Sequence, residues 1–190
     1  KIKIVAACDL NFTKRDNFSK KHRIKCYSHY DLMLRAHPEI DIVAIMSPSG
    51  MHYEHALKIL NKFRKHLIIE KPTTLKTSNL KKIFKIAEKL KRKIYPIYQN
   101  RNNKCVMKLK EEINKGKLGK IKIANLILRW CRTQRYYNLA EWRGTFSHDG
   151  GAATQQGVHY LDLLRYLAGD LKNILCKMKT YGAKIEVEDT

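Results

Sequence analysis

The sequence predicts an α/β fold, with a parallel β-sheet in the first half of the chain and a smaller α+β domain in the second. In residues 1–102, short apolar runs alternate with segments of helical spacing. This alternation implies βα units whose strands run parallel. After residue 103 the alternation stops and the apolar runs lengthen, which indicates a second domain in residues 103–190. The 190 residues, 44% of them hydrophobic, suffice for two small domains with cores of their own.

Each predicted strand of the first domain is a short apolar run that ends at a polar or turn-forming residue. The run at residues 66–69 has little polar alternation, which is typical of a parallel strand buried on both faces. The predicted strands are residues 1–8, 24–27, 41–46, 66–69 and 94–98, and the predicted helices are residues 12–22, 30–36, 51–63 and 77–92.

The second half predicts fewer and longer elements. A helix at residues 104–114 leads through two glycine turns into a long strand at 121–131. An irregular stretch rich in Arg, Tyr and Trp follows at 132–151, and a helix at 153–167 ends at Gly169. A further strand is expected at 173–181, and another where the chain reaches Thr190.

The net charge of +22 predicts a surface that attracts anions. Most of this excess is lysine along predicted helices, so solvated outer faces or a general lysine bias explain it best. Nucleic-acid recognition would need arginines and aromatics interleaved on one face, and no such stripe is present, so no specific nucleic-acid partner is expected.

The composition favours the cytoplasm. No apolar run is long enough to cross a bilayer, and the first residues turn polar too soon for a signal peptide, so no membrane association is expected. The five cysteines have no CxxC spacing, which argues against a zinc site or a disulfide framework. No metal is expected.

Polar side chains follow three predicted strands where each one ends. In a parallel sheet these carboxyl ends share one edge, which is where ligands bind in open α/β folds. An ammonium group at Lys71 would point at such a ligand, although Lys71 can also be a loop lysine beside a turn-forming proline. The residues brought together are Pro48, Ser49 and His52, then Glu70 and Lys71, then Asn100 and Arg101.

Asp9, at the end of the first predicted strand, fits the acidic residue that binds a ribose diol in dinucleotide-binding folds. A carboxylate there would repel the extra phosphate of NADP and so favours NAD. Aspartate also opens turns and caps helices, and the glycine-rich turn that should precede it is absent from this sequence.

A second cluster lies in residues 150–164. His159 and Asp162 are three residues apart and so share a helix face, where the carboxylate could orient the imidazole for proton exchange with a substrate hydroxyl. Gly150 and Gly151 would allow a ligand to approach the backbone. The other interpretation is a His and an Asp that satisfy each other at a packed helix start.

Taken together, these motifs resemble the glucose-fructose oxidoreductase and inositol dehydrogenase (Gfo/Idh/MocA) family. The resemblance rests on Glu70-Lys71-Pro72, the segment 47–52, Asn100-Arg101, and the segment 150–162. Within the family, segments 142–145 and 156–159 look most similar to dehydrogenases that oxidise a UDP-linked N-acetylated aminoglucuronic acid for surface-polysaccharide synthesis.

The resemblance implies an N-terminal Rossmann domain that binds NAD and a C-terminal open-sheet domain that supplies the substrate pocket and the interface of a homodimer or homotetramer. Lys71 would hydrogen-bond the reacting hydroxyl, and His159 would take or relay its proton. The implied cofactor-binding residues are Asp9, Pro48, Ser49, His52, Glu70, Lys71 and Asn100. The implied substrate-binding residues are Arg101, Trp142, Arg143, Gln155 and Asp162.

Two departures from the family matter. Inositol-type members have an acidic residue where this chain has Gln155, which favours a nucleotide sugar over an inositol. The family's first strand with its glycine-rich turn, and the end of its second domain, are not in this sequence, so a fragment with an incomplete Rossmann sheet is expected. Another sugar or inositol dehydrogenase, or a non-catalytic dinucleotide-binding or regulatory fragment, remain alternatives.

Overall fold

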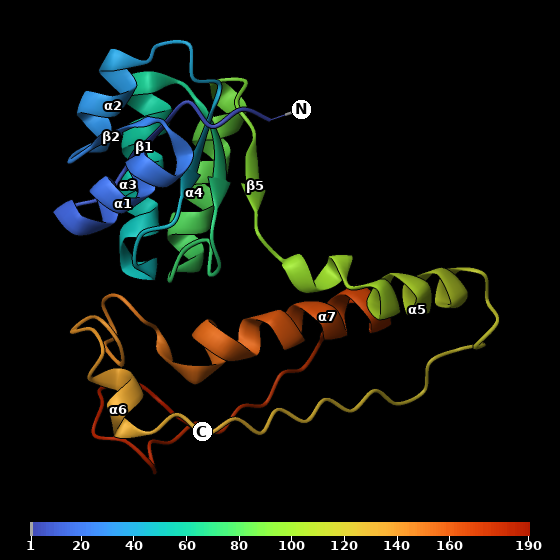
Figure 1. The fold of residues 1–190 in the computed structure, drawn as a ribbon. Coiled ribbons are helices and arrows are strands. Elements are labelled where there is room, and N and C mark those ends of the chain that lie inside the picture. The colour runs from blue at the N-terminus through green and yellow to red at the C-terminus, as the bar shows by residue number, and fades with distance from the viewer. Residues whose placement is uncertain (1) are drawn as a thin grey trace.

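The computed structural model describes residues 2–190, and in its N-terminal part strands and helices alternate as predicted (Figure 1). Helices α1 and α2 and strand β4 have the predicted bounds, whereas β1, β2, β3 and β5 are shorter than their apolar runs. The elements are β1 (Ala6–Cys8), α1 (Phe12–His22), β2 (Lys25–Tyr27), α2 (Tyr30–Ala36), β3 (Ile42–Ile45), η1 (Ser49–Met51), α3 (His52–Lys58), η2 (Ile59–Phe63), β4 (His66–Ile69), α4 (Thr77–Lys89) and β5 (Ile94–Pro96).

All strand pairs of the described residues are parallel, which confirms the predicted α/β architecture. Strand β1 pairs with β2, and β4 pairs with β3 on one side and with β5 on the other. These pairs form a two-stranded and a three-stranded sheet, and no backbone ladder joins the two within residues 2–190. The small, separate sheets agree with the expected incomplete Rossmann arrangement.

The core lies between the sheet centred on β4 and the helices α2, α3 and α4. Leu67 and Ile69 of β4 are 0% exposed, as are Leu60 of η2 and Ile83 of α4. The other face of β4 carries His66 and Ile68, which are only half-buried. The prediction of a strand fully buried on both faces is therefore right for one face of β4 only.

The C-terminal part is built on two helices that pack against each other, α5 (Lys104–Asn114) and α7 (Val158–Ala168), shown in Figure 1 below the α/β part. The remaining elements are η3 (Gln99–Asn102), α6 (Gln134–Tyr137) and the π-helical turn η4 (Ala153–Gly157), which continues into α7. The chain leaves α7 at Gly169, whose φ of 102° favours glycine. The boundary between residues 102 and 103 stays a prediction.

The predicted strands at 121–131 and 173–181 do not form in the described residues. The segment 121–131 runs extended between α5 and α6 (Figure 1), but it has no ladder partner and its side chains are exposed. A strand is defined by hydrogen bonds to a neighbour, so apolar periodicity without a neighbour gives only an extended chain. The open sheet of the second domain therefore stays a prediction.

Candidate active site

The carboxyl ends of β3, β4 and β5 place their following loops side by side, as the sequence predicts. Backbone hydrogen bonds continue past the strands, from Glu70 N to Ile45 O (3.1 Å) and from Ile97 N to Ile69 O (2.9 Å). The loop after β3 contains Pro48 and Ser49, the loop after β4 contains Glu70 and Lys71, and η3 after β5 contains Asn100 and Arg101.

The His52 side chain connects the loop after β3 with the loop after β4. Its side chain is buried (1% exposed), with Nδ1 2.8 Å from the Pro72 carbonyl oxygen and Nε2 2.8 Å from the Ser47 carbonyl oxygen. Both contacts are hydrogen bonds only when both ring nitrogens carry a proton, because a carbonyl oxygen only accepts. The cofactor-lining role that the resemblance implies for His52 stays a prediction; in this structure its polar atoms serve the scaffold.

Lys71 reaches from the loop after β4 to the turn before α7. Its half-buried ammonium donates to the Gln155 carbonyl oxygen at 2.5 Å and lies 3.5 Å from Gln155 Oε1. Burial lowers the pKa of Lys71 below its ordinary value, and nearby Arg132 lowers it further, whereas Glu70 and Asp149 oppose this shift. The structure thus places Lys71 in a loop at a junction between two parts of the chain, and its roles toward cofactor and substrate stay predictions.

Gln155 connects the same junction through its side chain. Its Nε2 donates to Ser49 Oγ at 2.6 Å and to the Asp149 carbonyl oxygen at 2.8 Å. The residue is 9% exposed, so both amide hydrogens are used within the protein. Its predicted role in substrate binding stays a prediction; the structure assigns its side chain to holding Ser49 and the loop at Asp149.

His159 lies on the first turn of α7, four residues after Gln155. Burial lowers the pKa of His159, and the positive charge of Lys71 lowers it further, while Glu70 and Asp162 act in the opposite direction. Lys71 and His159 are therefore within electrostatic reach of each other. The Nδ1 atom of His159 is buried and has no hydrogen-bond partner among the described residues.

The expectation that Asp162 orients His159 is wrong in this structure. The Asp162 carboxylate accepts two hydrogen bonds from Arg101, at 2.7 Å from Nε and 2.6 Å from Nη2. Arg101 also lies over the rings of Tyr98 and Tyr166. A bidentate guanidinium is a stronger partner for a carboxylate than a neutral imidazole, which explains why the spacing of His159 and Asp162 gave a wrong prediction of their pairing. The pair fastens η3 to α7.

A loop before η4 completes the junction. Asp149 is buried, its Oδ2 accepts from Gly144 N at 2.5 Å, and burial raises the pKa of its carboxyl group. Gly50 N donates to the His148 carbonyl oxygen at 3.1 Å. A Cβ at Gly50 would lie 2.1 Å from the Ser147 carbonyl oxygen, so only glycine permits this close approach of the two loops.

Asp9 follows β1 and is exposed. Its Oδ1 accepts from Asn11 N at 2.8 Å, in the turn before α1, so the turn-forming interpretation accounts for one carboxylate oxygen. The other oxygen has no assigned acceptor role within the described residues. The contact with a ribose diol stays a prediction.

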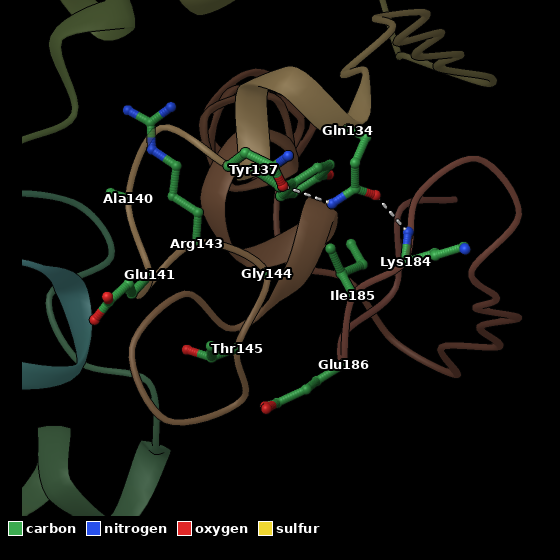
Figure 2. A pocket seen from close by; sticks show the side chains of 11 residues that line it. Gln134, Tyr137, Ala140, Glu141, Arg143, Gly144, Thr145, Lys184, Ile185 and Glu186 are labelled. Carbon is green, nitrogen blue, oxygen red and sulfur yellow. Dashed lines mark hydrogen bonds between the residues drawn. The ribbon is translucent and has the colours of Figure 1, made fainter.

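Two of the cavities among the described residues lie in the C-terminal part. One of about 430 Å³ is bordered by α6 and residues 184–186 (Figure 2), and Gln134 crosses it to Lys184 N at 2.7 Å. Of the predicted substrate residues, Arg143 lines this cavity. The other, of about 610 Å³, lies under η4 and is lined by Asp149 and Gln155 together with Arg132 and Tyr136. Asp149 and Arg132 were not predicted from the sequence; the Arg- and Tyr-rich composition of 132–151 was the available signal.

The described residues contain no group of three or more His, Cys, Asp or Glu side chains that could hold a metal ion. None of the helices in residues 2–190 combines the length and apolar character that a bilayer crossing requires.

Comparison with solved structures finds close similarity over nearly the whole chain. The WlbA dehydrogenase from Chromobacterium violaceum, solved in complex with NADH and UDP-GlcNAcA, superposes with a TM-score of 0.92 at 30% identity, covering 98% of this chain and 54% of that one. The WlbA dehydrogenase from Bordetella pertussis, with the same ligands, gives a TM-score of 0.92 at 29% identity and covers 98% and 58%.

Among curated proteins, D-glucoside 3-dehydrogenase from Escherichia coli (strain K12) is 26% identical over 173 residues, 88% of this chain and 47% of its own length. The scyllo-inositol 2-dehydrogenase (NADP(+)) IolW from Bacillus subtilis is 27% identical over 153 residues, 80% of this chain and 41% of its own. The chain thus spans about half the length of these curated relatives.

Residues 1–98 match the profile of the oxidoreductase family with an NAD-binding Rossmann fold, and residues 106–190 match the GFO/IDH/MocA C-terminal domain. The chain belongs to the GFO/IDH/MocA oxidoreductase family.

Proposed function

We propose that the protein is an NAD-dependent dehydrogenase that oxidises a hydroxyl group of an anionic nucleotide sugar, a UDP-linked N-acetylated aminoglucuronic acid, in the synthesis of surface-polysaccharide precursors. One observation carries the proposal. A half-buried amine at a strand end, Lys71, is held against the turn that continues into the helix of His159. An amine and an imidazole with lowered pKa values in one junction suit proton exchange with a hydroxyl group.

The residues at the sheet edge fit a nicotinamide dinucleotide. Asp9 supplies an exposed carboxylate at the end of β1 for the adenosine ribose, and that negative charge favours NAD over NADP. Pro48, Ser49, Glu70 and Asn100, on the loops after β3, β4 and β5, would line the side of the nicotinamide. When bound, the nicotinamide supplies the acceptor for the hydride that leaves the sugar carbon.

Lys71 acts on the substrate hydroxyl by donating a hydrogen bond to its oxygen, which stabilises the developing negative charge. To do so, its ammonium exchanges the Gln155 carbonyl oxygen for the substrate oxygen. His159 accepts the hydroxyl proton in its neutral form, which its lowered pKa favours at neutral pH. Gln155, held by Ser49 and Asp149, keeps the turn before His159 next to Lys71.

Two observations support an anionic nucleotide sugar as substrate. The net charge of +22 would concentrate a diphosphate near the protein. The two WlbA dehydrogenases, at 30% and 29% identity, are described with UDP-GlcNAcA and NADH. Another sugar or inositol is the second candidate, favoured by the similarity to the D-glucoside and scyllo-inositol dehydrogenases. We also propose that the protein acts in the cytoplasm as a homodimer or homotetramer.

The test is an assay of the complete protein with NAD and a panel of UDP-sugars, glucosides and inositols, followed at the absorbance of reduced nicotinamide. We expect turnover with UDP-GlcNAcA and loss of turnover in Lys71→Met, which preserves the length of the side chain without its charge. Turnover with only a glucoside or inositol would select the second candidate. Binding of NAD without turnover of any substrate would instead identify a non-catalytic dinucleotide-binding protein.

A further inference from the structure

Arg132, just after the extended segment 121–131, has a guanidinium group that is stacked but not neutralised. Its Cζ atom lies 3.9 Å from the centroid of the Trp130 ring and 4.3 Å from that of Tyr136. At such short distances the rings cover the planar faces of the guanidinium, so its N–H groups remain for an acceptor in the guanidinium plane.

No acceptor for these donors exists within residues 2–190. Arg132 takes part in none of the salt bridges of the described residues, and its Nε is buried without a hydrogen-bond partner. A buried donor without an acceptor costs about 1–3 kcal/mol, and more when it belongs to a charged group. A ligand oxygen at this position would remove that cost.

Arg143 brings a second positive charge to the same aromatic ring. Its Cζ is 4.3 Å from the Tyr136 centroid and 5.6 Å from that of Trp142, and its Nη1 donates to the Tyr136 carbonyl oxygen at 3.0 Å. Its Nε, like that of Arg132, is buried without a partner. Figure 2 shows the Arg143 side chain extending away from Lys184 and Ile185. Two guanidinium groups on one ring repel each other, and an anion between or beside them would offset this repulsion.

The cavity of about 610 Å³ gives a ligand access to Arg132, because Arg132, Tyr136 and Gln155 all line it. Its volume is that of a typical small-molecule site. Asp149, Glu188 and Asp189 also line the cavity, but none of them forms a salt bridge with Arg132 among the described residues. Their carboxylates accept hydrogen bonds from backbone N–H groups of other segments.

We propose that Arg132 forms an oxyanion subsite that binds a carboxylate or phosphate group of the substrate. The rings of Trp130 and Tyr136 hold its guanidinium in place, and Arg143 adds a second positive charge beside Tyr136. A planar guanidinium with stacked faces is already oriented for bidentate binding of such a group. The cavity reaches Gln155, whose carbonyl oxygen holds Lys71, so one ligand could place its hydroxyl at Lys71 and its anionic group at Arg132. The identity of the ligand rests on the proposed function; the anion chemistry does not.

The first experiment uses inorganic pyrophosphate as a probe that requires no catalytic activity. Binding is measured by titration calorimetry, which requires no change to the aromatic side chains around Arg132. We expect Arg132→Gln to weaken binding about tenfold or more and Arg132→Lys to weaken it less, because lysine keeps the charge but loses the fork. Arg135→Gln, the same charge change at an exposed position of α6, should bind like the wild type. Equal affinities of Arg132→Gln and Arg135→Gln, or no binding to the wild type, would overturn the subsite.

The second experiment identifies the group that is bound, using UDP-GlcNAcA and the uncharged-sugar analogue UDP-GlcNAc. Arg132→Gln weakens only UDP-GlcNAcA if the subsite binds the uronate carboxylate, and weakens both ligands equally if it binds the diphosphate. Either result supports the subsite. A wild type that binds pyrophosphate through Arg132 but no nucleotide sugar would leave the subsite standing and refute the proposed substrate. Nucleotide-sugar binding that is insensitive to Arg132→Gln would refute the subsite alone.

Discussion

The ion pair between Arg101 and Asp162 should be a principal tie between η3 and α7, and its removal offers a quantitative test. The Asp162 side chain is 11% exposed and that of Arg101 is 42% exposed. Loss of a fully buried pair member costs about 3–5 kcal/mol and that of an exposed one about 0.2–1 kcal/mol. Because Arg101 is partly screened by solvent, we expect Asp162→Asn to lower the free energy of unfolding by about 1–2 kcal/mol.

For a chain of this length, that loss corresponds to a fall in melting temperature of about 2–8 °C. Arg101→Gln should destabilise at least as much, since it leaves the Asp162 carboxylate without its cation. The double variant should fall short of the sum of the single changes, because both remove the same interaction. The assay is thermal and urea unfolding followed by circular dichroism.

Glu111→Gln on α5 is the matched control, because its carboxylate pairs with Lys108 and Lys115 on the exposed face of that helix. It should unfold like the wild type. If Asp162→Asn and Arg101→Gln both melted within about 1 °C of the wild type, or if their effects simply added, the inference that this pair fastens α7 would be wrong.

Three further outcomes follow from the site and the core. In the complete protein, kcat/KM should fall on the acid side with an apparent pKa below the ordinary histidine value of 6.5, because burial and Lys71 lower the pKa of His159 and keep its ring neutral to lower pH. An apparent pKa at or above 6.5, or one that does not change in His159→Asn, would contradict this role of His159. Gln155→Glu should lower the free energy of unfolding by about 1–3 kcal/mol at pH 8, because an ionised carboxylate cannot donate to Ser49 or to the Asp149 carbonyl oxygen. Urea titration measures the loss, and a stability equal to that of the wild type would refute it. Leu67→Ala, at 0% exposure in the centre of β4, should lower the free energy of unfolding by about 2–5 kcal/mol in the same assay, whereas Leu10→Ala on the exposed surface should lower it little. Similar losses in the two variants would show that the core lies elsewhere.

The α/β part was predictable because its elements are local and strongly patterned. Polar caps mark the starts of α1 and α5: Asn11 accepts from Lys14 N, and Asn103 accepts from Cys105 N. The loops after β3, β4 and β5 meet because parallel strands end at one edge, which requires no knowledge of side-chain contacts. Such consequences of topology are visible in a sequence.

The contacts that complete the site were not predictable, because they depend on which of several possible partners a side chain finds in three dimensions. The spacing of His159 and Asp162 favoured a pair on one helix face. In the structure, the Asp162 carboxylate instead accepts hydrogen bonds from Arg101, which lies 61 residues earlier in the chain. Likewise, the approach of Gln155 to Ser49 joins residues 106 positions apart. Arg132 was not predicted as a site residue, because the feature that marks it is its contact with aromatic rings and not a polar motif.

The extended segment 121–131 also has a consequence for how the chain behaves in solution. Its peptide groups are unpaired while Ile123 and Ile127 are 79% and 76% exposed, which together form a template onto which a strand of another molecule can add. Lys122 and Arg129 stand beside these residues, and the excess positive charge of the molecule opposes close approach of two copies. Self-association should therefore increase as salt screens this repulsion, so low ionic strength is the condition under which the isolated chain stays dispersed.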